Sequence, residues 1–295
     1  MIKKECFTAE WIEQVSSELH YNDKNLIEKV IRALSLLEML VKAGCPLVFK
    51  GGTALMLILG KSAHRLSIDI DLICPPGTNI EDYLKSFADF GFINLELVER
   101  KQRDDADIPK SHSKFFYQIA YRNDTDAQSY ILLDVLYEDI HYFRTQQIAI
   151  DCPFIRLEGK PLMVTVPSAE DILGDKLTAF APNTTGIPYY KNGRSCSMEI
   201  AKQLYDVGRL FENVSDLQIT KEAFRKIAVV ELSYRSFGTD IGQVFNDIRQ
   251  TALCISTRGK AGEGDFDLIQ DGIIRVKSFM YKQRYLIDHA IIDAA

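Results

Sequence analysis

The strongest constraint on the fold is residues 67–73, where polar and apolar side chains alternate. A period of two is typical of a β-strand with one polar and one apolar face. Asp69 and Asp71 are two residues apart, so a strand points both carboxylates to the same face while Ile70 packs behind them. Two carboxylates held side by side repel each other, so this pattern favours a site that receives a cation.

Carboxylate oxygens at this spacing suit Mg²⁺ or Mn²⁺. Mg²⁺ takes one or two carboxylates from a protein and completes its ligand shell with phosphate and water. On its own, however, an Asp-x-Asp pair is more often a strand with an exposed acidic face. The neighbouring motifs decide between these two interpretations.

A glycine turn precedes the acidic strand. Lys50-Gly51-Gly52-Thr53 joins a predicted buried strand at 47–49 to a predicted helix at 54–60, with Thr53 as its N-cap. Glycines let the backbone approach a ligand closely, and free N–H groups at the start of a helix attract phosphate, to which the Thr53 hydroxyl would add. A single Gly-Gly-Thr is also common as an ordinary capped turn. Combined with the paired acids, it favours a phosphate site.

A third acid, Asp134, lies inside the apolar strand pattern of residues 131–136. A carboxylate is costly to bury there without a partner. If this strand pairs with the strand that carries Asp69 and Asp71, three carboxylates converge, as is needed to hold two metals about 3.5–4 Å apart for displacement at phosphorus. Asp134 would then bind metal or accept the proton of the attacking hydroxyl. The alternative is an edge strand whose Asp134 faces water.

The order of the elements changes near Pro167. Before it, the pattern predicts helices and strands in alternation; after it, a capping box at Ser168 opens a mainly helical region. We expect two domains, 1–165 and 166–295. The predicted helices are 22–43, 54–60, 80–90, 168–180, 197–211, 221–230, 240–254 and 272–292, the predicted strands are 47–49, 67–73, 94–98, 115–121 and 130–137, and 100–114 is predicted as a loop.

Composition excludes several classes of protein. Hydrophobic residues make up 46% and charged residues 26%, which is ordinary for a globular chain. The net charge of −6 argues against broad coating of nucleic acid, although it allows a local basic groove. The N-terminus is amphipathic and no apolar run approaches the length of a membrane span, so we expect a cytoplasmic protein.

Other chemistries have little support in the sequence. Gly60-Lys61-Ser62 ends like a P-loop, but the glycine required five residues earlier is Leu55. The cysteines form no C-x-x-C pair. None of the histidines has metal-ligand spacing, and we interpret them as ordinary surface or packed residues, with attention to His64 beside Arg65; they are His20, His64, His112, His141 and His289.

Three blocks of residues resemble one known family. They are Lys50-Gly51-Gly52-Thr53-Ala54-Leu55 with Arg65-Leu66-Ser67-Ile68-Asp69-Ile70-Asp71-Leu72, then Asp171-Ile172-Leu173-Gly174-Asp175-Lys176-Leu177-Thr178-Ala179, and Gln203-Leu204-Tyr205-Asp206-Val207-Gly208-Arg209-Leu210. The first block is specific, the other two are weak individually, and together they cover about residues 45–211. In this order they are similar to the AbiEii/AbiGii-type toxin nucleotidyltransferases, which belong to the DNA polymerase β-like superfamily.

The resemblance implies an α+β fold: a polymerase β-like mixed sheet with flanking helices in the catalytic domain, 1–165, and a helical domain, 166–295, that completes the site. It implies that Asp69 and Asp71 bind metal, and that Lys176 and Asp206 belong to the site, where the lysine would meet triphosphate charge. The residues implied to bind nucleotide are Gly51, Gly52, Thr53, Arg65, Ser67 and Lys176. Without the resemblance, Lys176 and Asp206 would be interpreted as surface residues.

The chain departs from the family pattern in two places. Gln203 stands where the last block usually carries another acid, and a long polar loop, 182–195, separates Lys176 from Asp206. These departures affect the expected arrangement of Lys176 and Asp206. They do not affect the expected metal site at Asp69 and Asp71.

The implied activity is transfer of a nucleoside monophosphate from an NTP to a hydroxyl of RNA, such as tRNA, or of protein. The implied role is the toxin of a type IV toxin–antitoxin or abortive-infection system, with a cognate antitoxin as partner. Two basic stretches are candidates for acceptor contact, 189–194 with two tyrosines and 258–264 as a mobile loop. Three alternatives stay open: a non-catalytic nucleotide-binding module, kinase-like γ-phosphate transfer to protein, and a small-molecule adenylyltransferase.

Overall fold

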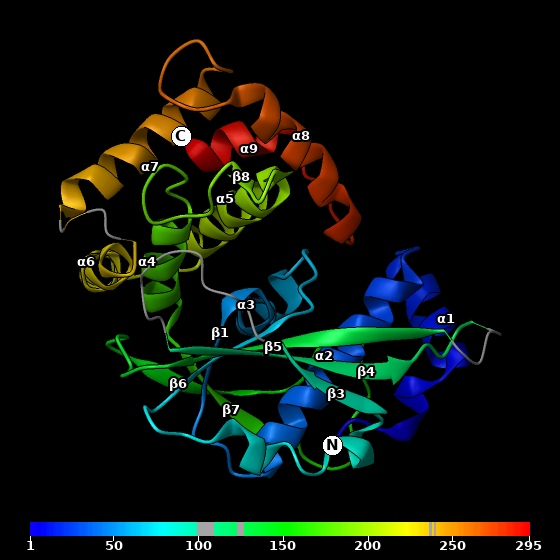
Figure 1. Cartoon of the computed structure of the whole chain (residues 1–295). Helices are drawn as coiled ribbons and strands as arrows, with labels where there is room; N and C mark the ends of the chain where they lie inside the picture. Colours follow the sequence, from blue (N-terminus) through cyan, green and yellow to red (C-terminus); the bar gives the residue numbers. More distant parts are fainter. Residues whose placement is uncertain (99–108, 123–126, 236–237, 239) are drawn as a thin grey trace. The chain divides into compact units, whose positions relative to one another are not determined.

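The computed structural model describes residues 1–98, 109–122, 127–235, 238 and 240–295. The chain folds as two compact units, which are coloured along the sequence in Figure 1. Among the described residues, the first unit holds 1–98, 109–122, 127–140 and 145–166, and the second holds 141–144 and those from 167 onward. The short segment 141–144 thus belongs to the helical unit, although β-strands flank it in the sequence.

A five-stranded mixed sheet forms the centre of the first unit, with the strand order β1-β2-β5-β4-β3. Only β2 and β5 run parallel within it; the other neighbours are antiparallel. The strand of Asp134 is therefore an interior strand, so the edge-strand interpretation is wrong. The strands are β1 (Val48–Lys50), β2 (Ile70–Cys74), β3 (Asn94–Leu97), β4 (Lys110–Gln118) and β5 (Gln128–Tyr137), with β6 (Thr145–Ala149) and β7 (Met163–Pro167) pairing separately.

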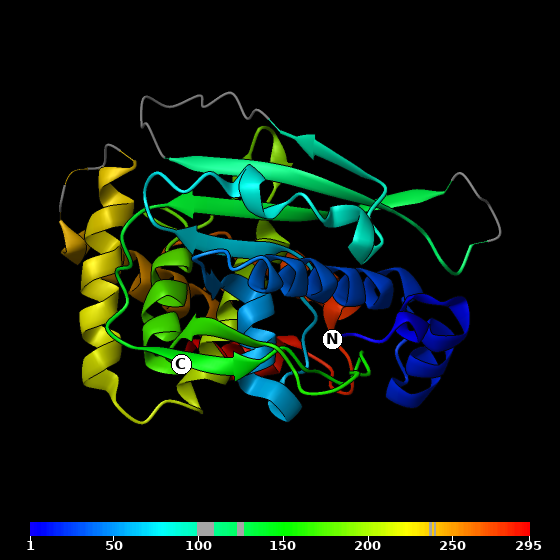
Figure 2. The same ribbon diagram turned by 90° about the horizontal axis from the view of Figure 1, so that it is seen from below.

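A long helix, α2 (Lys24–Lys42), runs along this sheet and contacts β2 and β5 (Figure 2). Its apolar residues recur at helical spacing and are buried, and Asp23 caps its first turn. Glu28 and Arg32 are buried on it as an ion pair, and Glu28 accepts the amide of Ala120 at 3.1 Å. The other helices of this unit are η1 (Lys4–Phe7), α1 (Ala9–Leu19), α3 (Gly51–Leu59), η2 (Gly60–Ser62), η3 (Ile80–Tyr83) and η4 (Phe87–Phe90).

The second unit is helical apart from a small hairpin. Helix α5 packs on α8 and α9 around buried aromatic residues, including Tyr205 and Tyr285, whose rings meet edge to face at 5.1 Å. Helix α6 packs against α4 and α7 around Phe224. The elements are α4 (Ala169–Ala179), β8 (Tyr190–Lys191), β9 (Arg194–Ser195), α5 (Ser197–Phe211), α6 (Leu217–Ser233), α7 (Ile241–Ser256), α8 (Phe266–Val276), η5 (Lys277–Phe279) and α9 (Ile287–Ala294).

The helix predicted at 80–90 is wrong. The segment forms two short 3₁₀ turns, η3 and η4, and ends at Gly91 in the left-handed conformation. A helix of this length is marginal by itself. Side chains of α2 hold the segment instead: Ser35 donates to the carbonyl of Phe90, and Arg32 donates to that of Gly91.

The loop predicted at 100–114 is wrong at its C-terminal end, because β4 already begins at Lys110. His112 and Lys114 gave this segment a polar appearance, but they alternate with Ser113 and Phe115, which are buried. This is the pattern of a strand with one polar face. Strand β4 also ends at Gln118, before the predicted limit at 121, and residues 100–108 lie outside the described part of the chain.

The long helix predicted at 272–292 is also wrong, because α8 starts earlier and the chain then leaves the helix before α9. Asp265 caps α8 by accepting the amide of Leu268. Between the two helices, Lys282 has a φ of 62°, and the neighbouring Tyr281 and Tyr285 are buried. Burial of these two rings outweighs continued helix formation. Helices α6 and α7 match the predictions with longer bounds.

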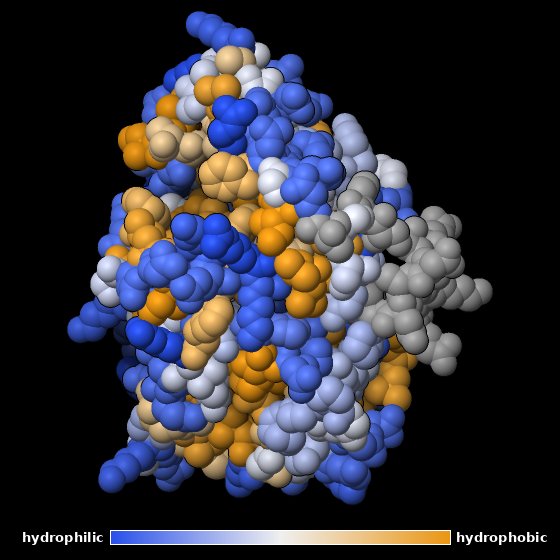
Figure 3. All heavy atoms as spheres, turned by 90° about the vertical axis from the view of Figure 1, so that its left-hand side faces the viewer, coloured by the Kyte–Doolittle hydropathy of each residue, from blue (hydrophilic) through white to orange (hydrophobic). Residues whose placement is uncertain are grey.

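The surface mixes polar and apolar side chains. Figure 3 shows apolar areas interspersed with hydrophilic ones on one face of the molecule. The exposed large apolar residues of the second unit include Phe211, Leu217 and Phe245. Among the described helices, none is both long and apolar enough to cross a membrane.

Candidate active site

Four charged or polar side chains form a row across the sheet of the first unit. Lys50 of β1 is the partner of Asp71 in β2, Asp71 is the partner of Asp134 in β5, and Asp134 is the partner of His112 in β4. Cross-strand partners point to the same face of a sheet. The prediction that the Asp134 strand pairs with the strand carrying Asp71 is therefore confirmed, and the two carboxylates are neighbours on one face.

The glycine turn lies directly against Asp71. Gly51 has a φ of +79°, and a Cβ built on it would overlap with the carboxyl group of Asp71. A side chain at this position would thus be strained in the backbone and would displace the carboxylate. Strand β1 ends at Lys50 and α3 begins at Gly51. The junction between these two elements therefore lies next to Asp71.

The second glycine contacts the loop before β2. A Cβ on Gly52 would lie 2.6 Å from the hydroxyl oxygen of Ser67 and 2.9 Å from a guanidinium nitrogen of Arg65. Arg65 is 7% exposed and donates to the carbonyl of Leu66 at 3.0 Å. The structure thus brings together Gly51, Gly52, Arg65, Ser67 and Asp71 at the start of one helix.

Thr53 does not have the position predicted for it. Helix α3 begins at Gly51, so Thr53 is not its N-cap, and its side chain is fully buried. Its hydroxyl donates to the main-chain carbonyl of Asp69 at 2.7 Å. The carbonyl of Asp69 thus bonds to α3 just before β2, which begins at Ile70 and not at the predicted residue 67. Thr53 therefore stabilises the junction and does not present its hydroxyl to a ligand.

Asp69 is exposed and lies just before β2. Lys29 of α2 lies near it and was not predicted from the sequence. Burial lowers the pKa of Lys29, while the nearby charge of Asp69 opposes that shift. The ammonium group of Lys29 also lies 5.4 Å from the ring centroid of Tyr130. Nothing in the local sequence around Lys29 marks it, because only the packing of α2 along β5 brings it close.

His112 is the second residue that sequence reasoning missed, since it was interpreted as an ordinary histidine. Its Nδ1 lies 2.6 Å from Oδ1 of Asp134, and the two side chains are 13% and 33% exposed. The alternation of polar and apolar residues in 110–118 was the available signal for a strand. Its register against β5 was not available from the sequence.

The donor set suits a hard cation that brings other oxygen ligands. Asp71 and Asp134 supply two adjacent carboxylates, as Mg²⁺ requires when phosphate and water complete its shell. In the part of the chain that the structure describes, no group of three or more His, Cys, Asp or Glu side chains is arranged to hold a metal ion. Of the predicted set, the structure pairs Asp71 with Asp134 in register, and Asp69 lies just before β2.

In the second unit, the structure brings Lys176 and Asp206 together. The Lys176 ammonium lies 2.9 Å from Oδ2 of Asp206 and donates to Oε1 of Gln203 at 3.0 Å. The two charged side chains are only 11% and 2% exposed. The interpretation of both as surface residues is wrong. Gln203, which departs from the family pattern, keeps the contact with the lysine as a neutral partner.

The two predicted acceptor stretches differ in the structure. The first forms the hairpin of β8 and β9, with Tyr190 58% exposed at its start. The second is a loop, as predicted, and it folds back onto α7, with Arg258 paired to Asp288 at 2.7 Å. Gly262 closely approaches the α7 backbone, which leaves no room for a side chain at this position.

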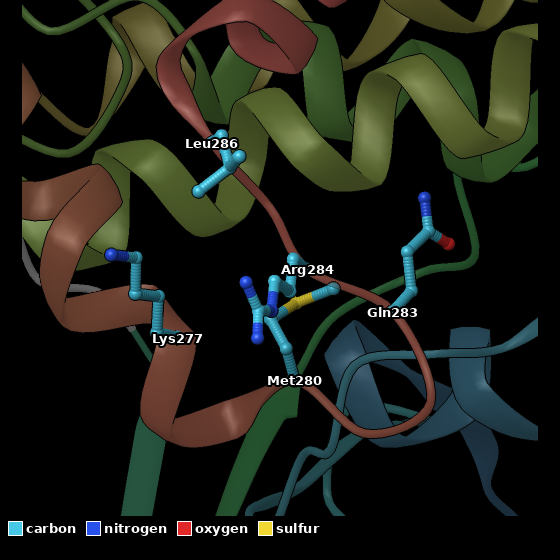
Figure 4. Close-up of a pocket in the computed structure, with 5 residues that line it drawn as sticks. All are labelled: Lys277, Met280, Gln283, Arg284 and Leu286. Atoms are coloured by element: carbon cyan, nitrogen blue, oxygen red, sulfur yellow. The ribbon is translucent and has the colours of Figure 1, made fainter.

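A cavity of about 340 Å³ also lies in the second unit (Figure 4). None of the residues predicted from sequence lines it. Its lining residues are Lys277, Met280, Gln283, Arg284 and Leu286.

The first unit thus carries two in-register aspartates on a mixed sheet, beside a glycine turn at a strand-to-helix junction. The family model for the nucleotidyl transferase AbiEii toxin of the type IV toxin–antitoxin system matches residues 33–277. The chain therefore belongs to the AbiEii nucleotidyltransferase toxin family. No curated protein matches it significantly.

Solved structures similar to this chain include one from Mycobacterium tuberculosis and one from Helicobacter pylori. MenT4, a nucleotidyltransferase toxin from Mycobacterium tuberculosis H37Rv, is 11% identical, with a TM-score of 0.52 over 96% of this chain and 86% of its own. JHP933 from Helicobacter pylori is 17% identical, with a TM-score of 0.44 over 90% of this chain and 89% of its own. At these identities, the likeness to MenT4 concerns the fold alone.

Proposed function

We propose that this protein transfers a nucleoside monophosphate from an NTP to a hydroxyl group and releases pyrophosphate. The observation that carries the proposal is the pairing of Asp71 with Asp134 on one sheet face, with the Gly51 turn against Asp71. A phosphate group at the start of α3 would meet free N–H groups beside two carboxylates. Membership in the AbiEii family supports the same chemistry.

In the proposed reaction, the acceptor oxygen forms a bond to the α-phosphorus. The bond from that phosphorus to the oxygen bridging the β-phosphate breaks, and pyrophosphate leaves with the electron pair. With the oxygen that His112 does not engage, Asp134 would either accept the hydroxyl proton or help to hold the ion that promotes loss of this proton to water. Gly51 and Gly52 let the backbone approach the triphosphate, and Arg65 and Ser67 lie beside Gly52 to contact phosphate or ribose.

The paired acids are suited to a divalent ion, Mg²⁺ or Mn²⁺. We assign Asp71 and Asp134 as its ligands, with Asp69 as a third. When bound, the ion would neutralise charge on the phosphates and orient them for in-line displacement. Lys29 would limit the repulsion between Asp69 and the phosphates, because it supplies a positive charge near that acid.

Lys176 and Asp206 are proposed to take part in the reaction, as the family resemblance implies. A lysine that is nearly buried and held by one acid and one amide is restrained to a single position. As a compact cation it would contact triphosphate oxygens, and Asp206 would keep it oriented.

The proposed acceptor is RNA, such as a tRNA end, and the proposed partner is a cognate antitoxin, as the family's type IV system implies. The exposed Tyr190 with Lys191 and Arg194 on the β8–β9 hairpin supports an RNA acceptor, since unpaired bases stack on aromatic side chains and cations meet phosphates.

The test incubates the purified protein and Mg²⁺ with cellular RNA or with protein extract, using NTPs labelled at the α or the γ position. Nucleotidyl transfer leaves α label on RNA. Transfer of γ label to protein would instead show kinase-like chemistry, and α label on small molecules an adenylyltransferase. Stable NTP binding without any transfer would show a regulatory module.

Asp71→Asn is the decisive variant, with Asp82→Asn as a matched control. Asp82 is an exposed acid of the same unit, and its carboxylate pairs with Lys85 and accepts a hydrogen bond from the side-chain amide of Asn79. We expect Asp71→Asn to abolish labelling and Asp82→Asn to retain it. Equal labelling by both would remove Asp71 from the mechanism. Induced expression should arrest growth with wild-type protein and not with Asp71→Asn.

A further inference from the structure

His112 and Asp134 form a contact that the family resemblance did not indicate. Their Cα atoms are paired across β4 and β5, and His112 Nδ1 lies 2.6 Å from Asp134 Oδ1. The distance is that of a short, charge-assisted hydrogen bond. With Nδ1 as the donor, the imidazole holds one oxygen of the carboxylate.

The position of Asp134 in the sheet determines how the hydrogen bond from His112 affects its carboxylate. Strand β5 lies between β2 and β4, so Asp134 has Asp71 on one side and His112 on the other. The like charge of Asp71 favours rotation of the Asp134 carboxylate away from the pair. A bond from β4 to Oδ1 restrains that rotation and leaves Oδ2 as the oxygen for a cation or a proton.

A contribution to stability alone accounts poorly for the pair. His112 is 13% and Asp134 33% exposed, so solvent partly screens the pair and limits its contribution to folding. Hydrogen bonds to a carboxylate that binds metal, in contrast, typically change metal affinity or activity by about 10–100-fold.

We propose that His112 is a positioning residue that orients the carboxylate of Asp134 for metal binding. The inference rests on the proposed function, because it takes Asp134 as a metal ligand. It assigns no group transfer to the imidazole: His112 acts only through Asp134.

The test compares three substitutions, His112→Asn, His112→Gln and His112→Ala. The amide nitrogen of asparagine takes about the place of Nδ1, whereas that of glutamine takes about the place of Nε2. Affinity for Mn²⁺ alone is measured without nucleotide, from the spectrum of free Mn²⁺. We expect the Gln and Ala variants to bind Mn²⁺ about 10-fold more weakly and the Asn variant to stay within about 3-fold of wild type.

A double-mutant cycle separates action through Asp134 from a direct effect. In an Asp134→Asn background, His112→Ala should change Mn²⁺ affinity no further. Thermal unfolding of each variant checks the fold, and the Asn and Gln pair carries the test if the Ala variant fails to fold.

The possible results separate the proposed role of His112 from the proposed nucleotidyltransferase activity. If wild type and all three variants bind Mn²⁺ equally and wild type labels RNA, positioning by His112 is refuted and the transferase stands. If wild type binds no Mn²⁺ and labels nothing, both proposals are refuted. If His112→Gln binds Mn²⁺ more weakly and His112→Asn binds it about as well as wild type, the result supports the role of the Nδ1 contact.

Discussion

Gly51 and Asp71 are in direct contact, with the carboxyl group of Asp71 occupying the space where a side chain of Gly51 would lie. The contact joins the two motifs that were recognised separately in the sequence. It requires glycine for two reasons, a φ of +79° and the absence of room for a Cβ. The conformation of the turn and the position of the acid therefore depend on each other.

We predict that Gly51→Ala reduces nucleotide transfer by roughly 100-fold, since displacement of a reacting group by about 1 Å has an effect of that order. Its backbone strain should also lower the free energy of unfolding by about 1–2 kcal/mol. Gly44→Ala is the matched control, because Gly44 has a φ of +75° with open space around its Cβ. Denaturant unfolding and α-label incorporation are measured for both. Similar activity losses in both variants would contradict the prediction.

The buried pair of Lys176 and Asp206 predicts a large effect on stability. Lys176→Ala leaves the acid buried without its cation and should lower the free energy of unfolding by about 3–5 kcal/mol. The double variant Lys176→Met with Asp206→Leu should recover much of this loss, since apolar residues of similar volume can replace a buried ion pair. Urea unfolding gives the stabilities. A double variant that is both stable and fully active would show that the pair is structural only.

Asp171 ties the segment 141–144 to the helical unit. Its fully buried carboxylate accepts the amides of Phe143 at 2.7 Å and Arg144 at 3.0 Å. Asp171→Ala removes the acceptor of both amides. It should lower the free energy of unfolding by about 1–3 kcal/mol for each amide that stays buried. Hydrogen exchange should show faster exchange of these two amides. Glu170→Ala, on the same turn of α4, removes exposed contacts to Ser215 and should leave their protection unchanged.

Close packing of α5 on α9 predicts that Gly208→Ala is destabilising. A Cβ at Gly208 would overlap with the carboxyl group of Asp293, which pairs with Arg209 at 2.8 Å. Overpacking of this kind costs about 1–3 kcal/mol. If the clash is the cause, Gly208→Ala combined with Asp293→Ala should be less destabilised than the sum of the two single variants. Additive losses in thermal or denaturant unfolding would point to another cause.

Local chemistry made some elements readable in the sequence. The alternation around Asp69 and Asp71 marks a strand with both acids on one face, and the glycines at 51–52 mark a turn. Ser168 opens α4 as its N-cap, with its hydroxyl accepting a hydrogen bond from the amide of Asp171. These signals depend on residues close together in the chain, so no knowledge of the tertiary structure is needed to recognise them.

Other features depended on contacts between distant residues. The 3₁₀ turns at 80–90 follow from bonds to Arg32 and Ser35 on α2, and the break between α8 and α9 follows from burial of Tyr281 and Tyr285. Periodicity cannot show such contacts, because the residues that decide the conformation lie elsewhere in the chain.

The acidic strand, the glycine turn and the change to a helical region could be predicted from local patterns in the sequence. The register of Asp134 beside Asp71, the contact of His112 with Asp134 and the pairing of Lys176 with Asp206 became visible only in the folded chain. The difference lies in the range of the interactions. Strand polarity and turn chemistry are local, whereas register between distant strands is set by which faces the whole chain can bury together.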